Sequence, residues 1–414
     1  MAVDGVLDAL AAQCGEGFAR TAGAADRVGE RQGRWVAAPA DARGVAGVLE
    51  VADRHDLAVV ACGAGTKLDW GTPPLRVDVL LDTGRLAGVA VAADGATVTV
   101  GAGTPLRAVH AAATRAGRRL PLDVGSAGAT VGGVLAVNEA GPLRFSAGAP
   151  RDLVTSVRYV RADGVVASAG GADTAGAVDT EEASDTARLL CGSFGTLAVI
   201  TAATLRLQPV PAARAWVTRS VRTPLEMHQL TSLLLAAPVP PTAVEINLPR
   251  GELTVLVEGL VDDVTRRTRA AHRLLGGDAS AAHRPPAWWG RYPFGADDIA
   301  LRLAVPFTDL HAAIYALRDA AGMSVPVRGT AGSGVVYAAL GAGTPPARVR
   351  TVVDAVRTTL LARGGSCVLL RAPDRVRAEV ERGHSGAVLP LVRRVKERFD
   401  PRGRLAPGRL AGGR

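Results

Sequence analysis

Cysteine is scarce in this chain, and the few cysteines are too far apart to build a metal site together. Cys14, Cys62, Cys191 and Cys367 form no C-x-x-C pair. Zinc sites and iron–sulfur clusters are held by closely spaced cysteine or histidine ligands. The pattern therefore predicts no metal or cluster bound by this chain alone. It also favours a reduced, cytoplasmic protein over a secreted, disulfide-bonded one.

Lysine is rarer still, since Lys67 and Lys396 are the only two. The formal net charge of +9 therefore depends on arginine, and the arginines are dispersed along the chain. Proteins that bind nucleic acids concentrate their basic residues on one face or along one helix. Nucleic-acid binding is thus a remote alternative, and we expect no nucleic-acid partner.

Membrane-targeting patterns are also missing. The first residues, MAVDGVLDALAAQCGEGFAR, have no basic start followed by an apolar core, so we expect no signal peptide. The uncharged stretch 189–205 is short for a membrane span of about 20 residues, and it contains glycine, serine and threonine. A buried loop and strand is the better interpretation, and no transmembrane segment is expected.

Glycine, in contrast, is abundant, and it gathers in the stretch LPLDVGSAGATVGGVLAVNEAG at 120–141. No charged side chain lies between Asp123 and Glu139. Thr130 can cap a short helix, and free N–H groups at a glycine-rich helix start suit a phosphate. The glycine spacing does not match the dinucleotide-binding fingerprint of Rossmann folds. A plain turn between core elements is the alternative interpretation.

A second glycine-rich segment follows a predicted apolar strand over 57–61. It reads Cys-Gly-Ala-Gly-Thr-Lys over residues 62–67. Glycines let the backbone turn tightly, and Thr66 and Lys67 add a hydroxyl and a point charge. The segment is a candidate anion cradle, and the alternative is a surface turn with an incidental lysine.

The hydrophobic pattern predicts a mixed α+β chain with a composition shift at Pro209. Before it we expect strands over 34–39, 77–81, 97–100, 153–161 and 165–168, a helix over 104–115 with Thr104 as N-cap, and an exposed loop over 170–185. After it we expect helices over 223–236, 261–275, 308–320, 346–363 and 389–399, with strands over 243–247, 253–258, 299–305, 335–339 and 366–370. Two rounds of strand and helix predict an α+β sandwich with helices on one face.

Four segments together carry a family resemblance: VVACGAGTKLDWG (59–71), the stretch 120–154, LLCGSFGTLAVITAATLRL (189–207) and VKERFDPRGRLAPGRL (395–410). In this order they resemble the vanillyl-alcohol-oxidase-type flavoproteins with a PCMH-type FAD-binding domain. Among these, the FAD-binding subunit of bacterial glycolate oxidase is the nearest resemblance. The resemblance implies a helical lead-in (1–29), a two-subdomain FAD-binding domain (30–211), an α+β ferredoxin-like cap (212–388) and a tail returning to the flavin domain (389–414).

The resemblance also implies an FAD held mainly by backbone amides. The implied contacts fall in a pyrophosphate loop, a second loop beneath the flavin, an adenine side and the C-terminal tail: Gly63, Ala64, Gly65, Thr66, Lys67; Gly125, Thr130, Val131, Gly132, Gly133; Gly195, Val199, Ile200; and Arg409. Thr66 stands where covalent relatives carry histidine, so the FAD is expected to be non-covalent.

Several positions depart from the family pattern. Cys62 and Ala64 replace a usual arginine and glycine. Residues 179–185 read Asp-Thr-Glu-Glu-Ala-Ser-Asp where the family often reads Lys-Asn-Val-Ala-Gly-Tyr-Asp, so a basic position has become acidic. The catalytic subunit of glycolate oxidase and related lactate dehydrogenases carry a motif of the form His-x-Gly-Asp-Gly-Asn-x-His. No two histidines of this chain have that spacing, so the sequence identifies no catalytic residue. Cap arginines, among them Arg291, Arg302 and Arg328, are candidates to hold a carboxylate. Trp288 and Trp289 lie in a proline- and tryptophan-rich connector over 285–294. They are candidates either to line the mouth of a substrate site or to anchor this connector on the core.

The sequence thus favours an FAD-dependent oxidoreductase subunit of a glycolate or other 2-hydroxy-acid oxidase complex, with hydride transfer from substrate to flavin. The expected partners are a small 2-hydroxy acid, a second flavoprotein subunit and an iron–sulfur subunit. We expect a cytoplasmic location, with attachment to the inner membrane face through partners as a further option. The alternative is a divergent, non-catalytic scaffold subunit that binds FAD weakly or not at all.

Overall fold

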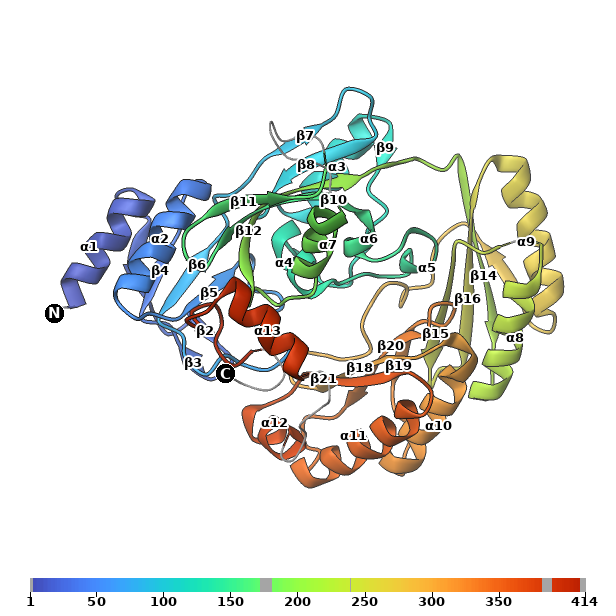
Figure 1. The fold of residues 1–414 in the computed structure, drawn as a ribbon. Helices are drawn as coiled ribbons and strands as arrows, with labels where there is room; N and C mark the ends of the chain where they lie inside the picture. The colour runs from blue at the N-terminus through green and yellow to red at the C-terminus, as the bar shows by residue number, and fades with distance from the viewer. Residues whose placement is uncertain (1–2, 172–180, 239, 382–388, 410–414) are drawn as a thin grey trace.

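The computed structural model describes residues 3–171, 181–238, 240–381 and 389–409, and it is a mixed fold of helices and strands (Figure 1). Two small sheets and their helices make up the first half of the chain. One large sheet, covered by helices, makes up most of the second half. The mixed fold class predicted from the sequence is confirmed.

The first small sheet has the strand order β1-β4-β6-β5 and is parallel among its last three strands. Its strands are β1 (Ala19–Thr21), β4 (Trp35–Ala37), β6 (Val79–Asp82) and β5 (Val59–Cys62), and a two-stranded ribbon, β2 (Arg27–Val28) with β3 (Arg31–Gln32), lies between β1 and β4 in sequence. Helices α1 (Val3–Cys14) and α2 (Ala42–Arg54) pack together beside it. Asp41 caps α2, and the apolar stripe of α2 is buried in a core shared with α1.

The second small sheet is antiparallel, with the order β11-β10-β12-β8-β7. Its strands are β11 (Val166–Ala169), β10 (Val154–Arg161), β12 (Ala198–Arg206), β8 (Thr97–Gly101) and β7 (Val89–Val91). The helices of this region are α3 (Leu106–Arg115), α4 (Val131–Val137), α5 (Arg144–Ala147), α6 (Pro150–Leu153) and α7 (Glu181–Leu190), and a short pair, β9 (Arg118–Arg119) with β13 (Gln208–Pro209), closes it.

Two local predictions in this region are wrong. Thr104 does not cap α3, because its hydroxyl donates to the Gly88 carbonyl and accepts from the Gly88 amide, which leaves Pro105 at the N-cap. The predicted exposed loop 170–185 ends in a helix, since α7 begins at Glu181 and buries Ala187 and Leu190 in the core. Residues 172–180 lie outside the described part of the chain, as do the side chains of 181–184.

The large sheet has eight strands in the order β17-β14-β16-β15-β19-β20-β18-β21, all antiparallel. They are β17 (Ser280–Ala282), β14 (Ala213–Ser220), β16 (Glu252–Gly259), β15 (Ala243–Leu248), β19 (Val327–Thr330), β20 (Val335–Leu340), β18 (Ile299–Ala304) and β21 (Ser366–Arg371). Helices α8 (Pro224–Ala236), α9 (Val261–Leu275), α10 (Leu310–Ala321) and α11 (Pro346–Leu361) cover one face, with a 3-10 turn (Phe307–Asp309) before α10 and α12 (Asp374–Glu381) beyond α11.

The helix-covered face buries the largest apolar core of the molecule, as the predicted sandwich requires. The opposite face of the large sheet is turned toward the first half of the chain (Figure 1). There α5 packs beside β15, and Leu143 and Trp289 pack with Trp216 of β14. This arrangement places the site between the two halves.

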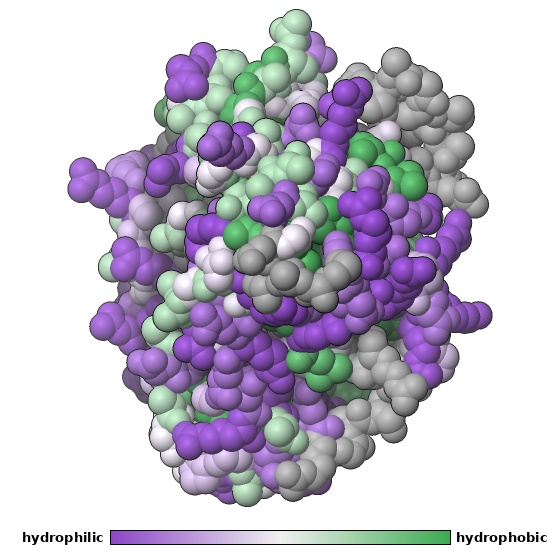
Figure 2. All heavy atoms as spheres, turned by 90° about the vertical axis from the view of Figure 1, so that its left-hand side faces the viewer, coloured by the Kyte–Doolittle hydropathy of each residue, from purple (hydrophilic) through white to green (hydrophobic). Residues whose placement is uncertain are grey.

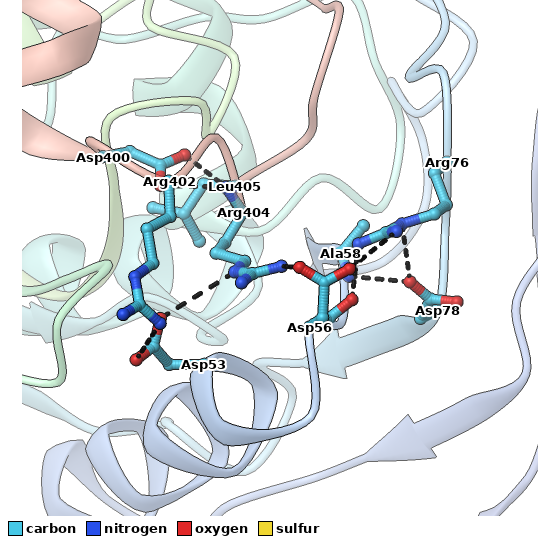
Figure 3. Close-up of polar contacts among 9 residues, drawn as sticks. All are labelled: Asp53, Asp56, Ala58, Arg76, Asp78, Asp400, Arg402, Arg404 and Leu405. Carbon is cyan, nitrogen blue, oxygen red and sulfur yellow. Dashed lines mark hydrogen bonds and ion pairs between the residues drawn. The ribbon is translucent and has the colours of Figure 1, made fainter.

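The C-terminal segment lies against the first sheet. After α13 (Leu389–Phe399), Leu405 pairs with Val59 of β5. Figure 3 shows the ion pairs that accompany this contact, in which Arg402 pairs with Asp53 and Arg404 with Asp56. Buried Lys396 pairs with Asp400 and donates to the carbonyl of Leu405 at 2.8 Å. The tail is therefore tied to the sheet that carries the first glycine-rich loop.

The outer face beside α1 and α2 is largely hydrophilic, with apolar side chains in small patches only (Figure 2). Among the described residues, no helix has the length and apolar character needed to cross a membrane.

Candidate functional site

The two glycine-rich loops predicted from the sequence lie against each other. The first follows β5, and Gly65 adopts a left-handed backbone (φ +73°) that only glycine accepts readily. A Cβ on Gly63 would lie 2.2 Å from the Thr130 hydroxyl of the second loop. Glycine at position 63 is therefore needed for the two loops to meet, and their contact forms one end of a groove.

The amides of the first loop are available to a ligand. Within the described part of the chain, the N–H groups of Ala64, Thr66 and Lys67 donate to no acceptor. Residues 64–66 are exposed, so solvent or a bound group must satisfy these donors. Successive free amides in a tight turn form a concave site for an anion such as a phosphate.

The second loop behaves differently from the prediction. Thr130 caps α4, as expected, by accepting from the Gly133 amide at 3.4 Å. The amides of Val131 and Gly132, however, donate to the carbonyls of Thr104 and Ala102, so the N–H groups expected to be free at this helix start are already used. What this loop contributes to the groove is a surface without side chains.

The groove between the loops comprises two adjoining cavities. Ala61, Gly63, Gly133, Ala136 and Phe194 line both cavities, which makes them continuous. The second cavity extends to Gly195, Ala198 and Ile200. Strand β8 pairs with β12 only from Ala202 onward, so the edge of β12 at 198–200 is unpaired on that side.

Arg409 closes the groove from the C-terminal tail. Its guanidinium donates to the carbonyls of Lys67, Leu68 and Trp70, at 3.3, 2.9 and 2.7 Å. It also lies 5.8 Å from the centre of the Phe194 ring. Burial lowers its pKa to about 10, so it remains charged at neutral pH. Arg409 therefore holds the first loop in place while carrying a positive charge at the groove wall.

Lys67 is not a free cation for an anionic ligand. Its ammonium group pairs with Glu139 at 2.8 Å, and both side chains are buried. Glu139 in turn accepts from the Ser126 amide at 3.1 Å and from the Tyr292 hydroxyl. The Lys67 charge is thus neutralised inside the protein, and the exposed amides and Arg409 remain to attract phosphates.

The groove fits an extended, phosphate-bearing cofactor with aromatic groups. Free amides and a buried arginine lie at the first loop, and an unpaired strand edge lies at the other end of the groove. Eleven of the predicted contact residues line it: Gly63, Ala64, Gly65, Thr66, Lys67, Thr130, Gly132, Gly133, Gly195, Ile200 and Arg409. Gly125, Val131 and Val199 do not line these cavities.

Gly125 instead faces a separate cavity, on the side of the large sheet. A Cβ on Gly125 would lie 2.8 Å from the Tyr292 ring. The same cavity is lined by Arg144 of α5, Glu245 of β15, Trp288, Arg291, Tyr292, Arg328 of β19 and Tyr337 of β20. The hydrogen bond between Tyr292 and Glu139, together with the pair of Glu139 and Lys67, connects this cavity to the groove.

Glu245 is the group in this cavity that sequence reasoning missed. Burial raises the pKa of its carboxyl from 4.5 to about 8.

Of the candidate carboxylate-binding arginines, Arg291 and Arg328 line the cavity, whereas Arg302 does not. The two tryptophans have different surroundings. Trp288 lines the cavity, whereas Trp289 packs edge-on against Trp216, with the ring centres 6.3 Å apart. Among the described residues, no group of three or more potential metal ligands comes together.

Comparisons with known proteins agree with this geometry. Residues 34–170 match the protein family described as "FAD binding domain". The chain is 35% identical to a D-lactate dehydrogenase of Archaeoglobus fulgidus over 42% of its length and 38% of that protein's. It is 31% identical to glycolate oxidase subunit GlcE of Escherichia coli, over 44% of this chain and 50% of that one. It therefore spans half or less of these two relatives.

Other similarities extend further along the chain. An uncharacterized FAD-linked oxidoreductase of Mycobacterium tuberculosis is 25% identical over 91% of both chains. Among solved structures, an alkyldihydroxyacetonephosphate synthase aligns with a TM-score of 0.71 at 15% identity, over 98% of this chain and 86% of that one. Glucooligosaccharide oxidase from Acremonium strictum aligns with a TM-score of 0.65 at 14% identity, over 90% of both chains. At such identities the structures establish the fold alone. Residues 34–170 therefore form an FAD-binding domain of the PCMH type, and FAD is its cofactor.

Proposed function

We propose that the protein is an FAD-dependent oxidoreductase subunit that oxidises a small 2-hydroxy acid within a glycolate-oxidase-like complex. The observation that carries the proposal is the pair of adjoining sites, an amide-lined groove for the cofactor and a cavity lined by three arginines beside it. Relatives named as D-lactate dehydrogenase and glycolate oxidase subunit support the substrate class. Bound FAD would supply the oxidant that accepts the hydride from the substrate.

The residues of the chain have separate roles in this proposal. The amides of Ala64, Thr66 and Lys67 hold the phosphates, and Arg409 positions the loop. Gly133 lets the cofactor approach the start of α4, and the edge of β12 takes the adenine side. Arg144 and Arg328 attract the substrate carboxylate into the second cavity. With threonine at position 66, the FAD is held without a covalent bond.

Partners complete the proposed activity. The four cysteines are too widely spaced in sequence to suggest a cluster, so electrons leave through a separate iron–sulfur subunit. Glu245 is protonated at neutral pH and is therefore a poor proton acceptor there, so a second flavoprotein subunit supplies most of the turnover. We place the complex in the cytoplasm, with contact to the inner membrane face through these partners.

A dye-reduction assay tests the proposal. The purified chain, loaded with FAD, is assayed with glycolate and D-lactate alone and after co-purification with its partner subunits. We expect slow or no turnover alone and an increase of orders of magnitude with partners. Robust turnover of the isolated chain, on the order of 10 per second, would contradict the need for partners. Absence of activity in both preparations would contradict the oxidoreductase assignment.

A second candidate function is a non-catalytic scaffold subunit that keeps the fold and binds FAD weakly. The observation that favours it is the internal neutralisation of Lys67 by Glu139, which leaves the first loop without a lysine charge for the phosphates. The methyl group of Ala64 in the same loop would also weaken FAD binding, because it crowds the approach of the phosphates. Flavin absorption bands in the purified protein distinguish the two functions, because a scaffold of this kind would purify colourless.

A further inference from the structure

Three residues that line the cavity beside the large sheet have polar atoms that the protein itself leaves unpaired. Within the described residues, Glu245 Oε1, Arg144 Nε and Trp288 Nε1 are buried and have no hydrogen-bond partner. All three residues line the same cavity, and they come from β15, α5 and the segment 285–294 before β18. A buried polar atom without a partner costs about 1–3 kcal/mol. Three such atoms around one cavity indicate a ligand that pairs with them.

Two of the three arginines that line this cavity, Arg144 and Arg328, are held in place by uncharged partners. Arg328 donates to Asn247 Oδ1 at 2.7 Å and to the Tyr292 carbonyl at 3.1 Å. Arg144 donates to the carbonyl of Asn138 at 3.2 Å. These acceptors are uncharged, so both guanidinium groups keep their full charge and have N–H groups to spare for an anion.

Glu245 contributes a proton instead of a charge. The carboxyl is fully buried, and desolvation raises its pKa to about 8, although a hydrogen bond from Thr330 and the charge of Arg144 act in the opposite direction. At neutral pH it is therefore mostly a carboxylic acid, which donates a hydrogen bond as well as accepting one. A carboxylic acid beside two arginines complements a ligand that carries both a carboxylate and a hydroxyl or carbonyl oxygen.

We propose that this cavity binds a small 2-hydroxy or 2-oxo carboxylate only while Glu245 is protonated, so that ionisation of Glu245 expels the ligand. Arg144 and Arg328 hold the carboxylate, Trp288 donates to it, and the acid form of Glu245 donates to an oxygen of the ligand. Once Glu245 ionises, its negative charge repels the bound anion. The identification of the ligand as a 2-hydroxy or 2-oxo acid rests on the proposed function, whereas the proton dependence rests on the cavity itself.

Other titratable and charged groups surround Glu245. Arg144 of α5, Arg328 of β19 and Tyr337 of β20 line the same cavity, and Asp123 from the second loop acts on Glu245 through its charge. Burial raises the pKa of Asp123 to about 7, so Asp123 ionises in the same pH range. Burial raises the pKa of Tyr337 above its ordinary 10, so Tyr337 stays neutral there. Asp123 is the group whose titration the experiment has to separate from that of Glu245.

The test is calorimetric binding of 2-hydroxyisobutyrate to the full chain between pH 6.5 and 9.5. This probe has the carboxylate and hydroxyl but no hydrogen on its α-carbon, so it binds without being oxidised. For the unmodified protein we expect the affinity to fall about tenfold or more across this range, because a group with a pKa near 8 is almost fully ionised at pH 9.5. Unchanged affinity over the range would overturn the proposal.

Three variants assign the effect, with thermal melting as the check on folding. Glu245→Gln keeps a hydrogen-bond donor without an ionisable group, so it should bind the probe with little pH dependence. Arg144→Met should weaken binding at least tenfold, whereas exposed Arg151→Met, the matched control, should bind normally. Asp123→Asn should keep the fall in affinity. If Asp123→Asn removes the pH dependence and Glu245→Gln does not, the assignment to Glu245 is wrong.

The outcome is separable from that of the proposed function. Flavin retention and dye reduction test the oxidoreductase, and probe binding requires neither. A flavin-containing protein that fails to bind the probe at any pH would refute this site while leaving the cofactor groove intact. A colourless protein that binds the probe with the expected pH dependence would support this site while refuting the proposed oxidoreductase.

Discussion

The cofactor groove and the cavity beside the large sheet recognise their ligands by different means. The groove presents backbone amides and glycine surfaces from two continuous segments, and its lysine is neutralised by Glu139. The cavity presents charged and polar side chains from four separate parts of the chain. The groove therefore depends on backbone shape, whereas the cavity depends on the protonation and charge of single side chains. Substitutions should affect the two sites in correspondingly different ways.

The largest expected effect is on flavin content. Gly133 lines both cavities of the groove, so Gly133→Val should reduce retained flavin at least tenfold while the protein stays folded. Gly132 lines only the second cavity, and Gly132→Val should destabilise the fold as well, because a Cβ there would lie 2.9 Å from the side chain of Ala102. We expect this second variant to lose stability by about 1–3 kcal/mol through overpacking. Flavin absorbance per chain and thermal melting measure both effects, and normal flavin content in Gly133→Val would contradict the placement of the cofactor.

A second test concerns the hydrogen bonds that join the C-terminal tail to the first loop. Arg409→Met leaves three carbonyls without their donor, which should cost about 1–3 kcal/mol and weaken flavin binding. Arg402→Met removes an exposed ion pair with Asp53 in the same segment and should cost at most about 1 kcal/mol. Urea unfolding with and without added FAD measures both. Equal behaviour of the two variants would show that Arg409 has no special role.

The free energy of unfolding should depend on pH because buried carboxyl groups at the cavity beside the large sheet titrate, and not because of groups in the cofactor groove. The pKa of Glu245 is about 8 in the folded chain, whereas an ordinary solvated glutamate has a pKa of 4.5. The folded state therefore holds this proton more tightly than the unfolded state does. The free energy of unfolding should therefore fall between about pH 4.5 and 8, by up to a few kcal/mol from this group. Asp123 acts in the same direction between 3.8 and about 7.

Glu245→Gln should flatten this dependence, and the flattening is read from urea unfolding at pH 5 and pH 8. The variant should gain stability relative to the unmodified protein at pH 8 and gain little at pH 5. If the difference between the two proteins is the same at both values, Glu245 is not buried as an acid.

The smallest expected effect is in the first loop. Ala64→Gly introduces the glycine that the family resemblance implies at this position, and the loop around it is exposed. We expect the affinity for FAD to rise a few-fold, equivalent to less than about 1 kcal/mol. Fluorescence titration of the flavin-free protein with FAD measures it. A weaker affinity would show that the methyl group packs against the cofactor instead of crowding it.

The contrast between the two sites also explains what could be predicted from the sequence. The groove could be predicted because its glycines and Thr130 lie in two short segments with recognisable turn and cap chemistry. The cavity could not, because Arg144, Glu245 and Trp288 are distant in sequence and meet only through the pairing of β15 with its neighbours. Nothing local distinguishes Glu245 from an ordinary strand residue.

The misses in secondary structure have similar causes. Strand β19 contains Gly329 and lacks an alternating pattern, and its place is fixed by pairing with β15 and β20. Thr104 has the side chain of a helix cap, but a tertiary contact with Gly88 takes that side chain. Long helices such as α9 and α11 were predicted almost to their ends because their apolar periodicity is strong.

The central claim, that this chain holds FAD without a covalent bond in the groove, is tested most directly by the visible spectrum of the purified protein before and after acid denaturation. The account predicts flavin bands in the native protein and their complete transfer to the supernatant when the protein is precipitated. A colourless protein that takes up no added FAD would contradict the claim, and so would flavin that remains attached to the denatured chain.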